Sequence, residues 1–132
     1  MDGVRAASIL DETAWPRELE RIRTNVRAAA ERLDAARVGG LRAGEIQLVR
    51  YPPGGFFMLH RDASEDPKEW RKLSVVVYLN DDFGGGATRF PALELDVLPR
   101  TGYALTFPPH HVHEGAPVER GVKYILSFWL GR

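Results

Sequence analysis

The feature that most limits the fold of this sequence is a series of short apolar runs between residues 45 and 130. Each run has the length of one strand, is rich in Val, Leu, Tyr or Phe, and is separated from the next by Gly, Pro or Asp. Many short strands with turns at close spacing predict a β-sandwich or barrel. The run at 73–79 is apolar on both faces, so we expect it to be a central strand. The runs are 45–51, 56–62, 72–80, 95–98, 103–107 and 122–130.

A helical periodicity precedes these runs. Between residues 15 and 38, apolar side chains recur at steps of three and four, which predicts an amphipathic helix covering one face of the sheet. Thr13 is the expected N-cap, Pro16 suits the first turn, and the pair Gly39-Gly40 is expected to end the helix. We therefore expect one domain over residues 1–132. The apolar positions are Leu19, Ile22, Val26, Ala29, Ala30, Leu33 and Ala36.

The absence of cysteine excludes several classes of site, and the charge balance disfavours nucleic-acid and membrane partners. Eighteen basic residues balance eighteen acidic ones, so no net field favours nucleic acid or an anionic membrane. Cysteine is absent, which excludes disulfides, zinc–thiolate sites, iron–sulfur clusters and a cysteine nucleophile. A metal would have to be held by His, Asp or Glu, as divalent iron, manganese, nickel or zinc can be. No signal core or membrane-length apolar run is present, so we expect a cytoplasmic protein without nucleic-acid or membrane partners.

His60 and Asp62 form the first part of a candidate metal site. Alternate residues of a strand face the same side, so this imidazole and this carboxylate are expected to project together. A third ligand is available among His110, His111 and His113. Two histidines and one carboxylate leave open positions on an octahedral metal, an arrangement typical of non-haem iron(II) oxygenases. The triplet alone also fits a metal-free hydrogen-bonded pair, and the histidine-rich segment also fits a solvated turn.

The last predicted strand carries a cation in an apolar setting. One of its faces presents Lys123, Ile125, Ser127 and Trp129. A buried lysine is costly unless it meets an anion. We therefore interpret Lys123 as the partner of the distal carboxylate of a dicarboxylic cosubstrate, with Ser127 as a neighbouring donor. A lysine that extends to water at the strand end is the alternative.

An ordered set of motifs extends from Glu45 to the end of the chain. The motifs are Tyr51 with Gly54 or Gly55, His60-x-Asp62, Tyr78-Leu79-Asn80, the segment 85–90, Pro99-x-x-Gly102 through Phe107, and His113-x-x-x-Pro117-Val118 followed by Lys123-Tyr124 and Trp129. By these motifs the sequence resembles the prolyl-4-hydroxylase-like branch of the iron(II)/2-oxoglutarate dioxygenases. This resemblance implies a mainly β fold: a double-stranded β-helix (jelly-roll, cupin-like) core at 45–132, with the amphipathic helix at 15–38 packed on the sheet.

The resemblance also implies roles for individual residues. His113 is selected as the third ligand because it lies four residues before Pro117 and ten before Lys123, relations that His110 and His111 do not satisfy. Arg89 is a candidate partner for a substrate carboxylate, with an ordinary solvated arginine as the alternative. The implied set is His60, Asp62 and His113 for the metal and catalysis, and Lys123, Tyr51, Tyr78 and Ser127 for 2-oxoglutarate.

The chemistry implied is hydroxylation of an unactivated C–H bond with Fe(2+), 2-oxoglutarate and O2, releasing succinate and CO2, and with ascorbate as a stimulatory addition. Asp62 favours hydroxylation, because related halogenases lack this carboxylate. The substrate expected is a peptide or a small molecule: a peptidyl proline, a free amino acid or a small biosynthetic intermediate. Residues 63–70 are polar and could cover the site as a lid.

Two features depart from the family pattern, and two other classes remain open. Ala87 stands where an acidic residue is usual, and only one helix precedes the core. A cupin-like metal-dependent isomerase or hydrolase would use the same three ligands without needing Lys123. A non-catalytic small-molecule-binding barrel would usually have lost a ligand. The sequence does not indicate an oligomeric state.

Overall fold

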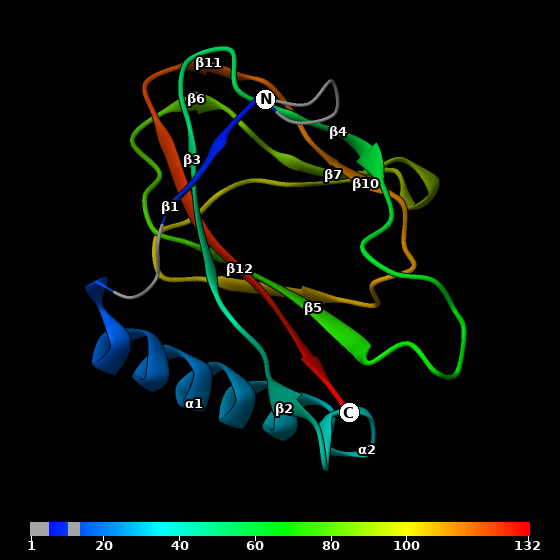
Figure 1. Cartoon of the computed structure of the whole chain (residues 1–132). Helices are drawn as coiled ribbons and strands as arrows, with labels where there is room; N and C mark the ends of the chain where they lie inside the picture. The colour runs from blue at the N-terminus through cyan, green and yellow to red at the C-terminus, as the bar shows by residue number, and fades with distance from the viewer. Residues whose placement is uncertain (1–5, 11–13) are drawn as a thin grey trace.

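The computed structural model describes residues 6–10 and 14–132. No helix in these ranges is long and apolar enough to cross a lipid bilayer. Figure 1 shows the described elements, which in chain order are β1 (Ser8–Leu10), α1 (Pro16–Leu33), α2 (Ala35–Val38), β2 (Arg42–Ala43), β3 (Gln47–Tyr51), β4 (Phe57–His60), β5 (Arg71–Tyr78), β6 (Gly84–Gly85), β7 (Thr88–Phe90), the 3-10 helix η2 (Pro91–Leu93), β8 (Leu95–Val97), β9 (Ala104–Phe107), β10 (His113–Gly115), β11 (Val118–Arg120) and β12 (Lys123–Gly131).

The larger sheet is antiparallel and has the strand order β1-β3-β12-β5-β9, with β2 paired to the end of β12. Its two longest strands, β5 and β12, lie side by side, and their register runs from Ile125 opposite Tyr78 to Leu130 opposite Leu73. The prediction that residues 73–79 form a central strand is confirmed, because β5 has β12 on one edge and β9 on the other.

Alternation along the strands gives the larger sheet two different faces. On β12, Leu126, Phe128 and Leu130 point to the side covered by α1 and α2, where they pack with Leu19 of α1 and Val38 of α2. This apolar layer between sheet and helices is the larger part of the core. Figure 1 shows α1 on this side of the sheet, and the prediction of an amphipathic helix packed on a β core is confirmed.

The opposite face of the larger sheet meets a smaller antiparallel sheet, whose order is β4-β10-β7-β8. Figure 1 shows β4, β7 and β10 on the side away from α1. The register of the smaller sheet places His60 of β4 directly opposite His113 of β10. Strands β6 and β11 form a separate two-stranded ladder. The space between the two larger layers holds the candidate site.

The helical region differs from the prediction at its end. The predicted continuous helix over 15–38 is two helices, because α1 ends at Leu33 and α2 begins at Ala35. Between them, Asp34 leaves the helical conformation, and its side chain accepts a hydrogen bond from the backbone N–H of Arg37 at 3.1 Å. A short Asp side chain that bonds nearby backbone competes with helix continuation and caps the next turn. Leu33 is consequently 86% exposed, so its assignment to the buried stripe was wrong.

The helix ends follow the prediction only in part. Pro16 occupies the first turn as expected, and Gly39 caps α2. The residue at the N-cap of α1 is Trp15, which makes no capping side-chain hydrogen bond. Thr13, the predicted N-cap, lies outside the described residues.

Candidate metal centre

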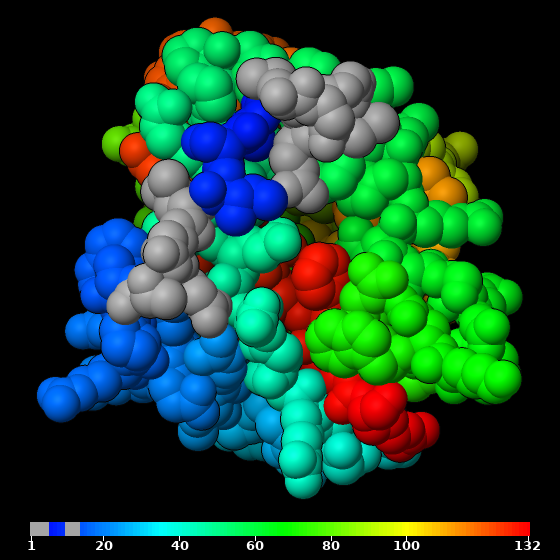
Figure 2. Space-filling model, viewed as in Figure 1, coloured from blue at the N-terminus to red at the C-terminus, as the bar shows by residue number. Residues whose placement is uncertain are grey.

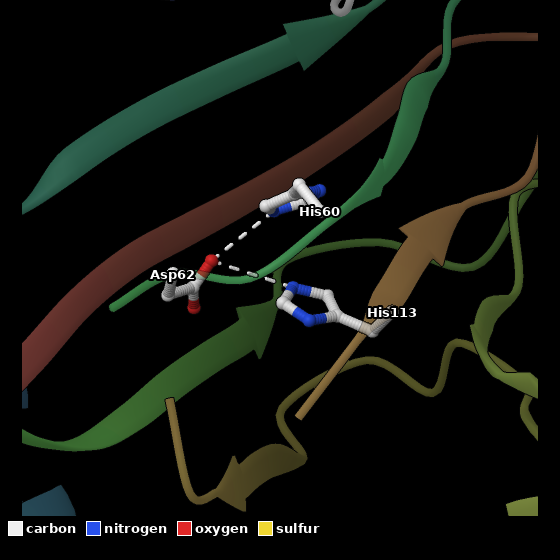
Figure 3. A group of neighbouring side chains, drawn as sticks. All are labelled: His60, Asp62 and His113. Carbon is white, nitrogen blue, oxygen red and sulfur yellow. Dashed lines mark hydrogen bonds and ion pairs between the residues drawn. The ribbon is translucent and has the colours of Figure 1, made fainter. Parts of the chain in front are cut away.

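The three predicted ligands lie on, or just beyond, two neighbouring strands of the smaller sheet. His60 is the last residue of β4, Asp62 follows two residues later, and His113 is the first residue of β10. The backbone N–H of Asp62 donates to the carbonyl of Pro109 at 2.9 Å, which ties the segment after β4 to the segment before β10. Figure 3 shows the three side chains directed toward one another.

The ligand atoms of His60, Asp62 and His113, here called the triad, lie within 4.8 Å of one another. Oδ1 of Asp62 is 3.1 Å from Nε2 of His60 and 3.4 Å from Nε2 of His113 (dashed lines in Figure 3). Neighbouring ligands on an octahedral ion with bonds of about 2.1 Å lie about 3 Å apart. The separations therefore match three adjacent positions on one face of such an ion.

Hydrogen bonds to backbone carbonyls fix the tautomer of both imidazoles. Nδ1 of His60 lies 2.7 Å from the carbonyl oxygen of Met58, and Nδ1 of His113 lies 2.9 Å from that of His111. A carbonyl only accepts, so each Nδ1 carries the hydrogen and each neutral ring presents the lone pair of Nε2. Two nitrogen lone pairs and one carboxylate oxygen thus converge on a single point. This donor set fits a divalent metal.

The second carboxylate oxygen of Asp62, Oδ2, contacts two side chains of the larger sheet. Ser74 donates its hydroxyl hydrogen to Oδ2 at 2.7 Å. The indole N–H of Trp129 points at the same pair, 3.0 Å from Oγ of Ser74 and 3.3 Å from Oδ2 of Asp62. These contacts turn Oδ1 toward the histidines. The role of Ser74 was missed in the sequence, where the only signal was one hydroxyl within an apolar strand.

Burial and hydrogen bonding shift the pKa of two triad residues. Burial alone would raise the pKa of Asp62, but the contact with His60, the charge of a protonated His113 and the hydrogen bond from Ser74 together outweigh it in the metal-free protein, so its pKa lies below 3.8. Burial lowers the pKa of His113 below 6.5, and the attraction of Asp62 offsets this only in part. The carboxylate is therefore ionised and this imidazole neutral at neutral pH, as metal ligands must be.

Aromatic side chains hold both imidazole rings. Phe57 stacks on His60 with ring centroids 3.7 Å apart and planes 12° apart. Phe107 meets His113 edge to face at 4.6 Å, and Phe90 lies further out at 5.7 Å. The rings of His60 and His113 are themselves 4.3 Å apart. Packing on several sides limits ring rotation and keeps the two Nε2 atoms directed at one point.

The triad lies in a cavity of about 240 Å³ between the two sheets, here called the metal cavity. Strand β12 contributes alternate residues to its wall, and β3 contributes the residues paired with them. Figure 2 shows a hollow between the teal surface of β3 and the green segment after β4, with the red of β12 visible inside. The cavity is lined by Gln47, Val49, Tyr51, Phe57, His60, Arg61, Asp62, Arg71, Val76, Thr88, His113, Gly115, Lys123, Ile125, Ser127 and Trp129.

Lys123 lies at the closed end of the metal cavity. Its residue is 2% exposed, its ammonium group donates to the carbonyl of Gly86 at 2.8 Å, and Nζ lies 4.8 Å from the ring centroid of Tyr51. Burial lowers its pKa from 10.5 to about 8. The alternative of a lysine extending to water is therefore wrong. An ammonium carries three hydrogens, and only one is used in the described contact, so it can still bind an anion in the cavity.

The remaining predicted site residues lie in different surroundings. Ser127 lines the metal cavity. Tyr78 lies behind the wall, where its hydroxyl is hydrogen-bonded to the cavity-lining Thr88 at 2.7 Å, and burial raises the pKa of this tyrosine. Arg89 lies on the outside of β7, exposed, with Asp96 at 3.5 Å and Glu114 at 3.9 Å. The structure thus brings together the triad, Lys123, Tyr51 and Ser127, but not Arg89.

The cavity lies between two antiparallel sheets. It contains two imidazoles and one carboxylate around a single point, with a buried ammonium group nearby. This arrangement is that of the facial-triad metal proteins. Within this class the family is established by comparison. The model of the 2OG-Fe(II) oxygenase superfamily matches residues 46–131. The chain therefore belongs to the 2OG-Fe(II) oxygenase superfamily, as the motifs predicted.

Two relatives show how much of a longer protein this chain resembles. It is 34% identical to a protein of Acanthamoeba polyphaga mimivirus over 108 residues, which covers 67% of this chain and 45% of the relative. It is also 34% identical over 91 residues to a PKHD-type hydroxylase of Sphingopyxis alaskensis, with 63% and 42% of the two chains covered. The chain thus spans less than half the length of these curated relatives.

A solved structure supports the fold over the full chain. The crystal structure of a Pseudomonas putida prolyl-4-hydroxylase superposes with a TM-score of 0.79 at 27% sequence identity, covering 100% of this chain and 74% of the other. The predicted mainly β fold, a double-stranded β-helix core with an N-terminal helix, is confirmed by this likeness.

Proposed function

We propose that this chain is an iron(II)- and 2-oxoglutarate-dependent hydroxylase of an unactivated C–H bond. One observation carries the proposal: two imidazole lone pairs and a carboxylate oxygen converge in the cavity that also contains the buried ammonium of Lys123. The triad fits a ferrous ion, and Lys123 fits the distal carboxylate of a dicarboxylic acid. Neither an isomerase nor a hydrolase of the same fold needs the second feature.

His60, Asp62 and His113 would hold the iron on one face and leave the opposite positions open toward the cavity. Iron, 2-oxoglutarate and O2 together supply the oxidising chemistry, in which one oxygen atom enters succinate and the other enters the hydroxylated product, with loss of CO2. Ser74 and Trp129 orient Asp62, and carbonyl acceptors orient the imidazoles. The contribution of the protein is positioning and exclusion of water.

Lys123 and Tyr51 would orient 2-oxoglutarate within the cavity. The two residues are directly opposite each other on β12 and β3, and the tyrosine ring packs on the ammonium group. Apolar walls from Val49, Val76 and Ile125 line the space between. In such surroundings a charge-assisted hydrogen bond is stronger than in water. Ser127 would add a minor polar contact, and Tyr78 would act only through Thr88.

The substrate class has support from the comparisons. The Pseudomonas putida structure is named a prolyl-4-hydroxylase, which makes a prolyl residue in a peptide the first substrate to examine. A free amino acid or a small biosynthetic intermediate is the next, because fold and metal do not fix the target.

Anaerobic reconstitution tests the proposed function. Adding ferrous iron and 2-oxoglutarate to the metal-free protein should give a weak visible charge-transfer band, and admitting air should then give succinate. His113→Ala should abolish both signals, whereas Arg89→Gln, which changes an exposed arginine outside the cavity, should retain both. A protein that gives neither band nor succinate belongs functionally with the isomerases, hydrolases or binding proteins of this fold.

A second variant tests the cosubstrate site. Lys123→Ala should weaken 2-oxoglutarate binding by about 1.5–3 kcal/mol, the usual worth of a hydrogen bond to a charged group. Iron affinity should persist, because the triad does not depend on the ammonium group. Unchanged affinity for 2-oxoglutarate in this variant would remove Lys123 from the proposed site.

A further inference from the structure

The metal cavity has a second cationic end, distant from Lys123. Along the cavity face of β12, Lys123 is at one end and Trp129 at the other. Six residues of a strand span about 20 Å. Strand β3 pairs with β12 along the same wall, so Tyr51 lies opposite Lys123 near one end and Gln47 lies opposite Ser127 toward the other. Arg71 lies over the Trp129 ring at 5.6 Å, so its guanidinium group marks the end away from Lys123.

The triad lies between these two ends. Asp62 contacts Trp129 at 3.3 Å, which places it toward the arginine side. On the other side, a Cβ added to Gly115, two residues beyond His113, would come within 4.0 Å of the ammonium nitrogen of Lys123. A cosubstrate bound to Lys123 and a substrate at the arginine end would therefore approach the metal from different directions.

Arg61 is the first of two arginines at this end, here called the arginine pair. It stands between two triad residues in sequence, lines the metal cavity and is exposed to solvent. Its neighbours Asp62 and Ala63 both donate backbone N–H groups to the carbonyl of Pro109, which fixes the chain beside it. No ion pair or side-chain hydrogen bond joins Arg61 to another residue in the described part of the chain.

Arg71 is the second member of the arginine pair. Its Nε and Nη2 atoms contact the carboxylate of Glu69, while Nη1 has no hydrogen-bond partner among residues 6–10 and 14–132. The guanidinium carbon of Arg71 lies 5.6 Å from the ring centroid of Trp129, within the range of a cation–π contact with this cavity-lining side chain. The free edge of this guanidinium group can therefore donate to a second anion without releasing Glu69.

Charge balance favours an anionic substrate at this end. Iron(II) and dianionic 2-oxoglutarate have equal and opposite charges, and so do Asp62 and Lys123, so these four groups together contribute no net charge. Arg61 and Arg71 together exceed Glu69 by one positive charge, and Asp62 is the only carboxylate that lines the cavity in the described residues. One excess positive charge at a solvent-accessible opening matches a monoanionic group.

We propose that the arginine pair binds a carboxylate of the substrate and so places a nearby C–H bond at the metal. The inference rests on the proposed function and names its substrate class: an acid whose reacting carbon lies close to a carboxylate. Two kinds of substrate have such a carboxylate: a free amino acid, and a peptide whose C-terminal residue is the one hydroxylated. It is a specificity-determining contact separate from the Lys123 site.

Calorimetric titration of the protein loaded with ferrous iron and 2-oxoglutarate, without oxygen, tests the proposal with matched acids and amides. The probes are L-proline and L-prolinamide, and a pentapeptide ending in proline with a free or an amidated carboxyl terminus. At least one acid should bind about tenfold or more tightly than its amide, the effect of one charge-assisted hydrogen bond. Preference for the free amino acid or for the peptide identifies the source of the carboxylate.

Variants connect the preference to the arginine pair. Arg61→Gln and Arg71→Gln should each reduce the acid-to-amide ratio to near one, while the affinity for 2-oxoglutarate stays unchanged. Arg89→Gln is the matched control and should preserve the ratio. Acids that bind no better than amides, or a ratio that survives in both variants, would reject the arginine pair as the carboxylate site. If either of these results is obtained while the protein still gives the charge-transfer band with iron and 2-oxoglutarate, only this inference is rejected. If the unaltered protein gives no such band, the proposed function is rejected as well.

Discussion

Ser74, a small residue among apolar neighbours, supports the metal site through its hydrogen bond to Asp62. It is 1% exposed in the middle of β5, and its hydroxyl bridges the carboxylate of Asp62 and the indole of Trp129. Residues behind a metal ligand commonly set its orientation and charge. The first ligand shell is therefore supported by two strands of the larger sheet, although all three ligands come from the smaller sheet or its margins.

Ser74→Ala should lower the affinity for ferrous iron about tenfold to a hundredfold, because the remaining contact of Oδ2 with Trp129 is the longer one. Anaerobic titration with ferrous iron measures the change. Ser127→Ala is the matched control, since Ser127 also lines the cavity but makes no hydrogen bond to Asp62 among the described residues. Equal iron affinity in the two variants would show that Ser74 does not position the carboxylate.

Binding of 2-oxoglutarate should weaken as pH rises above about 8. Burial lowers the pKa of Lys123 to about 8 in the free protein, and only the ammonium form attracts the distal carboxylate. Below that pH the lysine is charged and affinity is constant; above it the charged fraction, and with it the affinity, falls about tenfold per pH unit. Calorimetry between pH 7 and pH 9.5 measures the slope. Lys123→Arg keeps its charge throughout, so a comparable slope in this variant would contradict the assignment.

At the scale of elements, strands with clear alternation were predictable and the shortest were not. The runs that became β3, β4, β5, β8, β9 and β12 were recognised from their apolar residues. Strands β6, β7, β10 and β11 have two or three residues, too few to show a period, and two of them contain glycine. They exist because distant partners supply the hydrogen bonds, as β4 and β7 do for β10.

The same limit applies to the candidate site. Side-chain alternation alone correctly placed His60 with Asp62 and Lys123 with Trp129, because each pair lies on or beside one strand. His113 could be chosen among three histidines only by its spacing to later motifs, since its strand was not recognised. Arg71 and Ser74 were missed because their partners, Trp129 and Asp62, come from other elements. Contacts between elements depend on sheet order, which periodicity does not report.

Helix α1 offers a matched pair of leucines that tests its packing. Leu19 is 5% exposed within the helix–sheet core, whereas Leu33 is 86% exposed at the end of the same helix. Leu19→Ala should lower the free energy of unfolding by about 2–5 kcal/mol, the range for buried leucines. Leu33→Ala should change it by less than about 0.5 kcal/mol. Urea unfolding measures both, and equal losses would show that α1 does not pack as described.

At the scale of the whole molecule, the half-buried Asp62 and the buried His113 and Lys123 make stability depend on pH in one direction. Each has a folded-state pKa below its unfolded value: Asp62 below 3.8, His113 below 6.5, and Lys123 at about 8 instead of 10.5. Whenever the unfolded state binds more protons, stability rises with pH. For Asp62 and His113, stability is therefore lost as pH falls through the folded-state values, so the metal-free protein should unfold more readily in acid.

Lys123 opposes folding at neutral pH, and the metal-free protein should show this directly. Below pH 8 the lysine is charged in both states, so the full cost of burying its charge is present; between pH 8 and 10.5 the folded state loses its proton first and the cost is relieved. Lys123→Met should therefore raise the free energy of unfolding at pH 7 by up to ~3 kcal/mol, with the gain shrinking toward pH 10.5.

Urea unfolding of the metal-free protein at pH 7 and pH 10 measures this difference, and the same variant should lose its affinity for 2-oxoglutarate. A variant less stable than the original protein at pH 7 would mean that the contacts of the ammonium group with Gly86 and Tyr51 outweigh the cost of burial. A more stable variant that no longer binds the cosubstrate would show that this fold retains a destabilising charge because the dicarboxylate needs it.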